Sequence, residues 1–268
     1  MSETHGKVDR MIDGMINVNR NEVERYLGLA KAFSKNDKAA ADPDNGNLDK
    51  EHLDKIIDEC IADMQQQVTP RYTYKRFPIE WKFSFKLVPD DDQNGENKKG
   101  GFRKEKKTTC SFAGIEVASG NLLKNLEGCG EIVLMAVTLG PAPDMLVRKA
   151  EVRDMMKAYT YQAVGAAMAE AWCDEVNDMI IKEAKEEGLF ARPRFSPGYG
   201  DFPLEVQKDF ERILEMPKTV GVTLSDSLLM TPTKSITAVI GLTEIDSNCE
   251  KSGCEQCAMA GKCAYSRN

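Results

Sequence analysis

The sequence predicts an α+β fold. We expect a single domain with a mostly antiparallel central sheet flanked by helices, an N-terminal helical extension and a Cys-rich C-terminal tail. Three observations predict it: helical periodicity before residue 70, aromatic and β-branched runs with partial alternation after it, and four of the eight cysteines within the last twenty residues. The expected boundaries are 1–69 for the extension, 70–244 for the domain and 245–268 for the tail.

Three helices are predicted in the extension. Apolar residues at helical spacing indicate a short helix over 8–16, and Asn19 or Asn21 can cap a second one that carries Val23, Tyr26 and Leu27. A third apolar stripe follows, and Pro70 ends it. The stripe consists of Leu53, Ile56, Ile57, Cys60, Ile61 and Met64. Because Cys60 lies on this stripe, we interpret it as a core thiol.

Strand patterns dominate the following part. Residues 72–87 alternate and are rich in aromatic side chains, whereas residues 89–101 are almost all polar or glycine and predict a long solvated loop. The nearly continuous apolar run 131–139 is typical of a central strand buried on both faces. Further strands are expected at 219–223 and 235–242, and helices at 122–126, 144–187 and 204–214.

Composition excludes several classes of function. A chain of 268 residues with a net charge of −7 and mixed charges lacks the basic face of a nucleic-acid binder. The two histidines, His5 and His52, lie in polar settings, which argues against a Ser-His-Asp hydrolase and a zinc hydrolase. No apolar run has the length of a membrane span, and no secretory signal is recognisable, so the expected location is the cytoplasm.

Glu170 lies in a predicted helix made almost entirely of small residues, from Gln162 to Trp172. Small side chains let a ligand or another backbone approach closely. A carboxylate there is either solvated or held for a partner, and spacing alone favours the solvated face.

The Pro- and Gly-rich loop from Arg192 to Phe202 carries more chemistry. Arg194 offers a fork of donors for a carboxylate, Pro197-Gly198 predicts a sharp turn with room for a ligand, and Tyr199 offers an aromatic face and a hydroxyl. These groups suit S-adenosylmethionine, which presents a carboxylate, an adenine and a sulfonium. A structural turn with a surface arginine is the alternative that the residues alone leave open.

From about residue 110 to 242 the chain resembles the activation domain of cobalamin-dependent methionine synthase. The resemblance is carried by the segments Val137–Gly140, Met168–Trp172, Arg194–Tyr199, Gly221–Pro232 and Ser235–Thr237. The pair of Arg-x-x-Pro-Gly-Tyr and Val-Thr-Leu-x-x-Ser-x-x-Met-x-Pro is specific, although either motif alone is weak. A shorter stretch, Asn19–Gly28, resembles the N-terminus of stand-alone versions of this domain.

The resemblance implies that Arg194, Tyr199 and Glu170 contact S-adenosylmethionine, with the backbone around Ser196, Pro197 and Gly198 lining the site. A family aspartate near the N-terminus and an aromatic residue near the C-terminus have no match in this chain. The implied site is therefore incomplete or closed by other residues.

The resemblance also implies the partners. In the family, the domain presents S-adenosylmethionine while an electron donor reduces an oxidised cobalamin, and the methyl group moves to cobalt. The Asp-x-His-x-x-Gly pattern that holds cobalamin is absent from this sequence, as is a metal-ligand set for activating homocysteine. We therefore expect the cobalamin on a separate methionine synthase or other corrinoid protein, and no nucleic acid or membrane among the partners.

The tail contains a further candidate site with the spacing C-x4-C-x2-C-x5-C, formed by Cys249, Cys254, Cys257 and Cys263. Thiolates at such spacing can wrap one soft metal centre. The first three resemble the plant-type ferredoxin run, which favours an iron–sulfur cluster over zinc. A reduced tail without metal, or disulfides formed on handling, is the alternative. We expect Cys110, Cys129 and Cys173 to be ordinary core or surface thiols.

Three functions remain open from the sequence. The favoured one is a trans-acting, S-adenosylmethionine-binding subunit for reductive remethylation of a corrinoid protein, a component of methyl transfer that is inactive without its partner. The second is an iron–sulfur electron-transfer or docking protein with a vestigial ligand site. The third is a binding scaffold without turnover. A conventional methyltransferase is disfavoured, because no Gly-rich loop follows a first strand.

Overall fold

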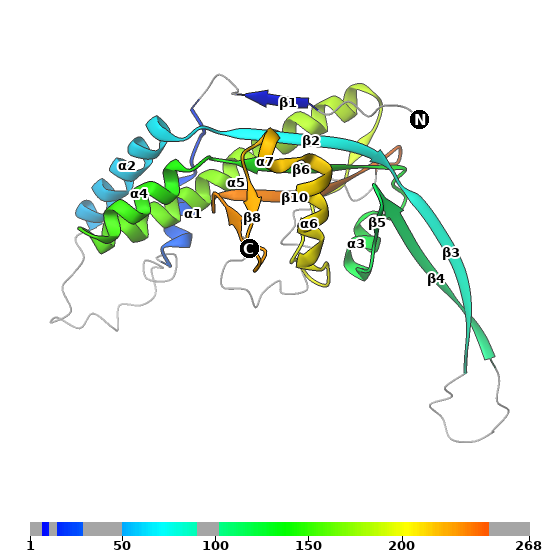
Figure 1. Ribbon diagram of the computed structural model, residues 1–268. Helices are drawn as coiled ribbons and strands as arrows, with labels where there is room; N and C mark the ends of the chain where they lie inside the picture. Colours follow the sequence, from blue (N-terminus) through cyan, green and yellow to red (C-terminus); the bar gives the residue numbers. More distant parts are fainter. Residues whose placement is uncertain (1–6, 11–14, 29–49, 90–101, 247–268) are drawn as a thin grey trace.

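A computed structural model describes residues 7–10, 15–28, 50–89 and 102–246. Its main element is an antiparallel sheet in the order β1-β2-β6-β10-β7. The strands span Lys7–Arg10 (β1), Arg71–Pro78 (β2), Glu131–Thr138 (β6), Phe190–Ala191 (β7) and Ser235–Thr243 (β10). The long strands run side by side through the middle of the molecule (Figure 1). The predicted α+β class with a mostly antiparallel sheet is confirmed.

The centre of the sheet is β6, which pairs with β2 on one side and β10 on the other. Ser235 lies opposite Thr138 and Leu242 opposite Glu131. From Ile132 to Gly140 every residue of this segment is buried. This confirms the prediction that the apolar run is covered on both faces.

Helices α1 (Arg20–Tyr26), α2 (Lys50–Gln67), α4 (Ala142–Glu151) and α5 (Met155–Glu186) share one hydrophobic core with one face of the sheet. Asn19 caps α1 by accepting from the backbone N–H of Asn21, as its sequence position predicts. The stripe on α2 is buried as predicted, with Ile57, Cys60 and Met64 wholly inaccessible. Burial raises the pKa of the Cys60 thiol to about 12, which fits a core thiol.

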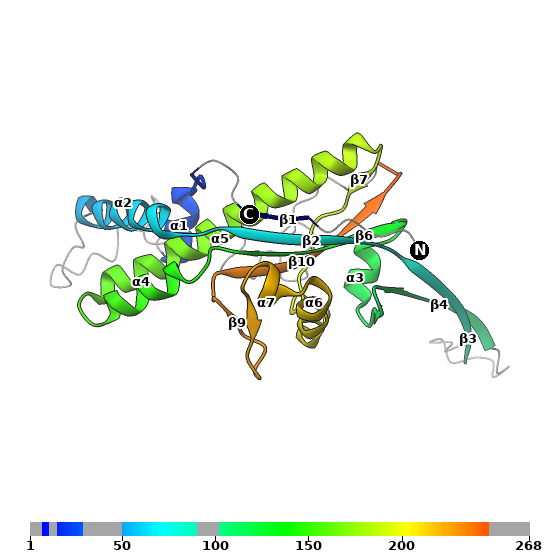
Figure 2. The same cartoon turned by 45° about the horizontal axis from the view of Figure 1, so that its top comes forward.

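A second hydrophobic core lies on the other face of the sheet. It is formed with α3 (Gly120–Asn125), the 3-10 turn Leu204–Val206, α6 (Gln207–Leu214) and α7 (Met216–Thr219). Figure 2 shows α3, α6 and α7 below the strands and the C-terminal half of α5 above them. The sheet therefore separates two cores, each with its own helices.

A two-stranded arm projects from one end of the sheet (Figure 1). It consists of β3 (Glu80–Pro89) and β4 (Phe102–Phe112), with the short β5 (Ile115–Glu116) paired at its base. The indole N–H of Trp81 donates to the carbonyl of Cys129 at 2.9 Å and joins the arm to the second core. The predicted loop spans 89–101, but Pro89 is instead the last residue of β3, and residues 90–101 lie outside the described residues.

Two predictions from local pattern are wrong. The helix expected over 8–16 is contradicted at its start, because Lys7–Arg10 is a strand that pairs with β2. Backbone pairing along an open sheet edge outweighs the short apolar periodicity.

The strand expected over 219–223 is largely wrong as well. Met216–Thr219 forms α7, Val220 closes it, and only Thr223–Leu224 is a strand, β8. The short β8 pairs with β9 (Met230–Thr231) as a separate hairpin. Buried Met216 and Val220 join the second core from a helical turn.

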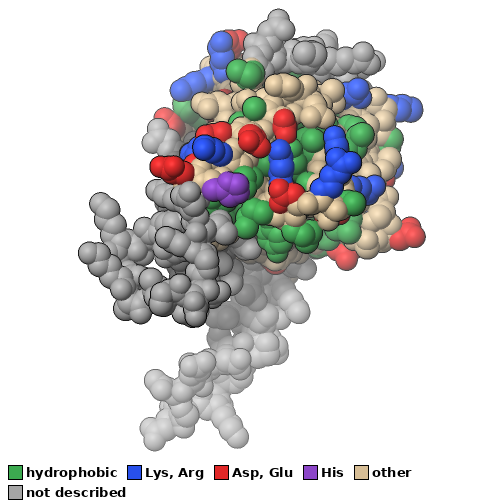
Figure 3. Space-filling model, turned by 90° about the vertical axis from the view of Figure 1, so that its left-hand side faces the viewer, with side chains coloured by type: hydrophobic (Ala, Val, Ile, Leu, Met, Phe, Trp, Pro, Cys, Tyr) green, Lys and Arg blue, Asp and Glu red, His purple; other side chains and the backbone are tan. Residues whose placement is uncertain are grey.

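His52 is exposed on α2. The face of the molecule in Figure 3 carries side chains of both charges among hydrophobic ones. Within the described ranges, no helix is both long and apolar enough to cross a membrane.

Candidate functional site

Glu170 lies on α5, at the border between the buried face of the helix and solvent. Ala163, Val164, Ala167 and Met168 pack in the first core, and this burial orients α5 on the sheet. The Glu170 side chain is 33% exposed. It is held for a partner rather than solvated, because it forms an ion pair with Arg194.

Arg194 reaches Glu170 from the edge of the sheet. The segment before the turn runs antiparallel to β10: Arg192 N–H donates to the Gly241 carbonyl at 2.8 Å, and Phe195 and Val239 exchange two backbone bonds of 2.8 Å. Successive side chains of an extended segment point to opposite faces. Arg194 therefore faces α5, where its Nη2 donates to Glu170 Oε2 at 2.8 Å and its Nη1 donates to Asp174 Oδ1.

The electrostatics of this cluster favour a ligand with positive charge. Burial alone would lower the pKa of Arg194, but the adjacent Cys173, Asp174 and Glu170 raise it above its usual range. Burial raises the pKa of the Cys173 thiol to about 12, so this cysteine is a neutral neighbour. One guanidinium and two carboxylates leave the cluster with one excess negative charge.

The turn after Arg194 has the geometry that Pro197-Gly198 predicts. Tyr199 N–H donates to the Ser196 carbonyl at 3.1 Å, and Gly198 has φ +87°. A β-turn with proline second and a positive-φ glycine third is type II. A Cβ on Gly198 would lie 3.2 Å from Leu204 Cδ1, so the glycine also allows close packing on the following 3-10 turn.

Tyr199 belongs to an aromatic cluster on the second core. Its ring meets Phe195 edge-on, with centroids 6.1 Å apart, and Phe195 packs on Phe202 at 6.2 Å. Phe202 is 2% exposed, whereas Tyr199 is 48% exposed. Tyr199 thus has a fixed position and an accessible ring.

Asp201 fixes the same loop to α3. Its carboxylate accepts from Ser119 Oγ, from Gly120 N–H at 2.7 Å and from Asn121 N–H at 3.1 Å. These bonds, led by that from Ser119, lower the pKa of Asp201. The sequence reasoning missed this contact, and no local pattern indicates it.

Asp174 was missed as well, although a signal existed. It lies four residues after Glu170, and this spacing puts both carboxylates on one helix face. Two carboxylates on one helix face, together with a candidate arginine elsewhere in the chain, would have indicated a shared partner.

The predicted ligand residues fall into two groups. Glu170 and Arg194 meet directly on the α5 side. Ser196, Pro197, Gly198 and Tyr199 follow where the chain crosses to the second core. Tyr26 of α1 adjoins the first group: burial, and next the charge of Glu170, raise its pKa.

The predicted metal ligands Cys249, Cys254, Cys257 and Cys263 lie outside the described residues. In the part of the chain that the structure describes, no three His, Cys, Asp or Glu side chains are grouped to hold a metal ion. Cys110, Cys129 and Cys173 are buried core thiols there, as expected.

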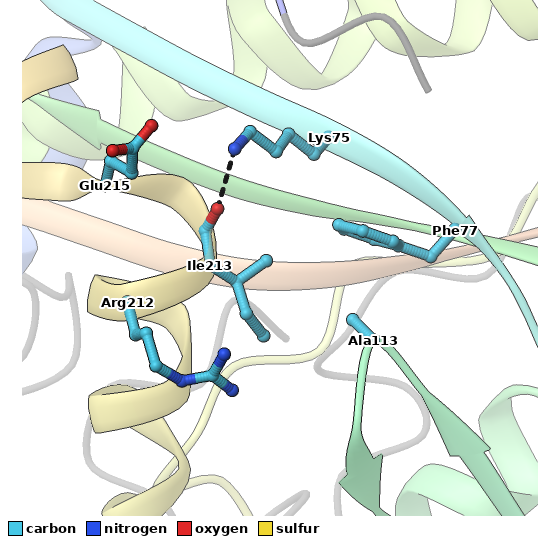
Figure 4. A pocket seen from close by; sticks show the side chains of 6 residues that line it. All are labelled: Lys75, Phe77, Ala113, Arg212, Ile213 and Glu215. Carbon is cyan, nitrogen blue, oxygen red and sulfur yellow. Dashed lines mark hydrogen bonds between the residues drawn. The ribbon is translucent and has the colours of Figure 1, made fainter. Parts of the chain in front are cut away.

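A separate open hollow of about 520 Å³ lies between α6 and β2 (Figure 4). It is lined by Lys75, Phe77, Ala113, Arg212, Ile213 and Glu215. Lys75 Nζ donates to the Ile213 carbonyl at 2.8 Å and spans its upper edge. None of the predicted ligand residues lines this hollow, so it is distinct from the candidate site.

Comparison with known proteins shows a likeness among solved structures. No family model and no curated protein matches the sequence. Among solved structures, the chain is similar to the MetH reactivation domain bound to AdoHcy, with 17% identity and a TM-score of 0.48. The similarity covers 74% of this chain and 66% of that one.

Proposed function

We propose that this chain binds S-adenosylmethionine at the Arg194 cluster and the Ser196–Tyr199 turn. We further propose that it acts in trans in the reductive remethylation of a cobalamin-dependent methionine synthase or related corrinoid protein. The observation that carries the proposal is the Arg194 side chain, 22% exposed and paired with Glu170 at 2.8 Å, just before the Pro-Gly-Tyr turn.

The groups of the ligand match the groups of the site. Arg194 can bind the carboxylate with its planar fork of donors, and Glu170 is left to accept the ammonium group. The excess negative charge of the cluster favours a ligand that also carries a sulfonium. The exposed ring of Tyr199 offers a flat surface for the adenine.

In the reaction that we propose, the chain presents the methyl group and does not hold the cobalamin. The partner's cobalamin, reduced by one electron from a separate donor, supplies the nucleophile. The methyl carbon is transferred as the bond to sulfur breaks, and S-adenosylhomocysteine remains. The residues of this chain bind and orient the donor, so we expect no turnover without the partner.

Titration calorimetry with S-adenosylmethionine tests the binding step. We expect Arg194→Ala to weaken binding more than about tenfold, the effect of losing a charged hydrogen bond and its ion pair. The affinity of Arg194→Lys should lie between those of the wild type and Arg194→Ala, because lysine keeps the positive charge but lacks the planar fork of donors. Arg212→Ala is the matched control, since Arg212 is 65% exposed, pairs with Asp209 and lines the separate hollow. A wild-type protein that binds no S-adenosylmethionine would refute the proposal.

The spacing of the four cysteines in the tail supports the second candidate function, an iron–sulfur electron-transfer or docking protein. Only the sequence supports this candidate. Iron and sulfide analysis with visible absorption of anaerobically purified protein tests it. We expect the wild-type protein to be coloured and to contain iron. A variant with Cys→Ser at all four positions, 249, 254, 257 and 263, should lose both the colour and the iron. A colourless, iron-free protein would leave zinc or a metal-free tail.

A further inference from the structure

The guanidinium of Arg194 has two carboxylate partners within the chain. Nη2 donates to Glu170 and Nη1 donates to Asp174, and both carboxylates project from consecutive turns of α5. A ligand carboxylate that binds Nη1 and Nη2 end-on competes with Glu170 and Asp174 for the same two nitrogens.

The two partners differ in how firmly they are held. The Asp174 side chain is 47% exposed, and that of Glu170 is 33% exposed. Releasing a carboxylate into water is cheaper when it is already half hydrated. Asp174 is also the shorter side chain, so a small rotation withdraws it from Arg194.

We propose that Asp174 is an internal competitor that occupies the ligand-carboxylate position on Arg194 until a ligand displaces it. This rests on the proposed function and extends it to specificity. Only a ligand with a carboxylate can replace what Arg194 loses, so the site selects nucleosides that carry an α-amino-acid group over those that lack one.

Asp174 also stabilises Arg194. The Arg194 side chain is 22% exposed, and burying a cation without a partner costs free energy. The ion pair with Asp174 therefore stabilises the folded protein at the expense of affinity for a ligand carboxylate.

The test is titration calorimetry of wild type and Asp174→Asn with three ligands. These are S-adenosylmethionine, S-adenosylhomocysteine and 5′-methylthioadenosine, of which the last lacks the amino-acid group. Asparagine keeps the shape and removes the charge. We expect the first two ligands to bind about three- to tenfold more tightly to the variant, the range for a charged hydrogen bond with one exposed partner. We expect the affinity for 5′-methylthioadenosine to be unchanged.

Controls separate competition from general effects. Asp178→Asn removes an exposed carboxylate one turn further along α5 and should leave all three affinities unchanged. Asp174→Ala serves as a second variant and should act in the same direction. Circular dichroism checks that each variant is folded.

Unchanged or weaker binding of S-adenosylmethionine to both Asp174 variants would reject the role of Asp174 as a competitor. An equal gain in affinity for 5′-methylthioadenosine would reject it too. In both cases the proposed function would still stand. If neither wild type nor variants bind S-adenosylmethionine, both proposals are rejected.

Discussion

Arg194 and Phe195 are neighbours in the chain, but they belong to different cores. Arg194 reaches α5 and is held by ion pairs to Glu170 and Asp174, whereas Phe195 joins Phe202 on the opposite face. The charged side depends on partly exposed polar contacts, each worth about 1 kcal/mol, and the aromatic side depends on burial worth several. The difference indicates that burial holds the aromatic side of the turn in place, whereas the polar contacts on the charged side can be exchanged for contacts with a ligand.

Removing burial from the aromatic side should have the largest effect on stability. Phe202→Ala deletes a ring that is 2% exposed, and we expect a loss of about 3–5 kcal/mol in the free energy of unfolding. Urea unfolding measures it. Leu229→Ala is the control at an exposed position and should change stability by no more than about 0.5 kcal/mol. A small loss for Phe202→Ala would mean that this side is not held by burial.

A change in the backbone next to the turn should lower the free energy of unfolding by less than the loss of the Phe202 ring. Gly200 has φ +56°, and a Cβ there would lie 2.6 Å from Asn121 Nδ2. We expect Gly200→Ala to cost at least about 1–2 kcal/mol, the strain of a left-handed residue, plus displacement of Asn121. Gly188→Ala is the matched control, because its φ is +78° and nothing lies within 4 Å. Equal thermal unfolding midpoints for the two variants would show that contact with Asn121 adds nothing.

The anchor of the turn to α3 should give the smallest effect, and one that depends on pH. The pKa of Asp201 is lowered in the folded protein, so its contribution to stability is present above its unfolded pKa of about 3.9 and is lost as the pH falls through the folded value. We expect Asp201→Asn to lower the melting temperature at pH 7. The difference from wild type should shrink below about pH 4, and a constant difference would contradict the assignment.

Several elements of the fold followed from local pattern. The stripe with Ile57 and Met64 predicted α2, and the unbroken apolar run predicted buried β6. These predictions succeeded because burial of one helix face, or of both faces of a strand, constrains the residue type at each position. The segments 8–16 and 219–223 failed because they are short, and neighbouring strands or the second core decided their conformation.

The sequence by itself determined that an arginine, a Pro-Gly turn and a tyrosine follow one another within six consecutive residues. Only the tertiary structure decided what they contact. Asp174 lies 20 positions before Arg194, and Ser119 lies 82 positions before Asp201. The sheet edge and α5 bring these groups within hydrogen-bond distance, and no local periodicity specifies such pairs. The physical reason is that backbone pairing to β10 sends Arg194 to one face and Phe195 to the other.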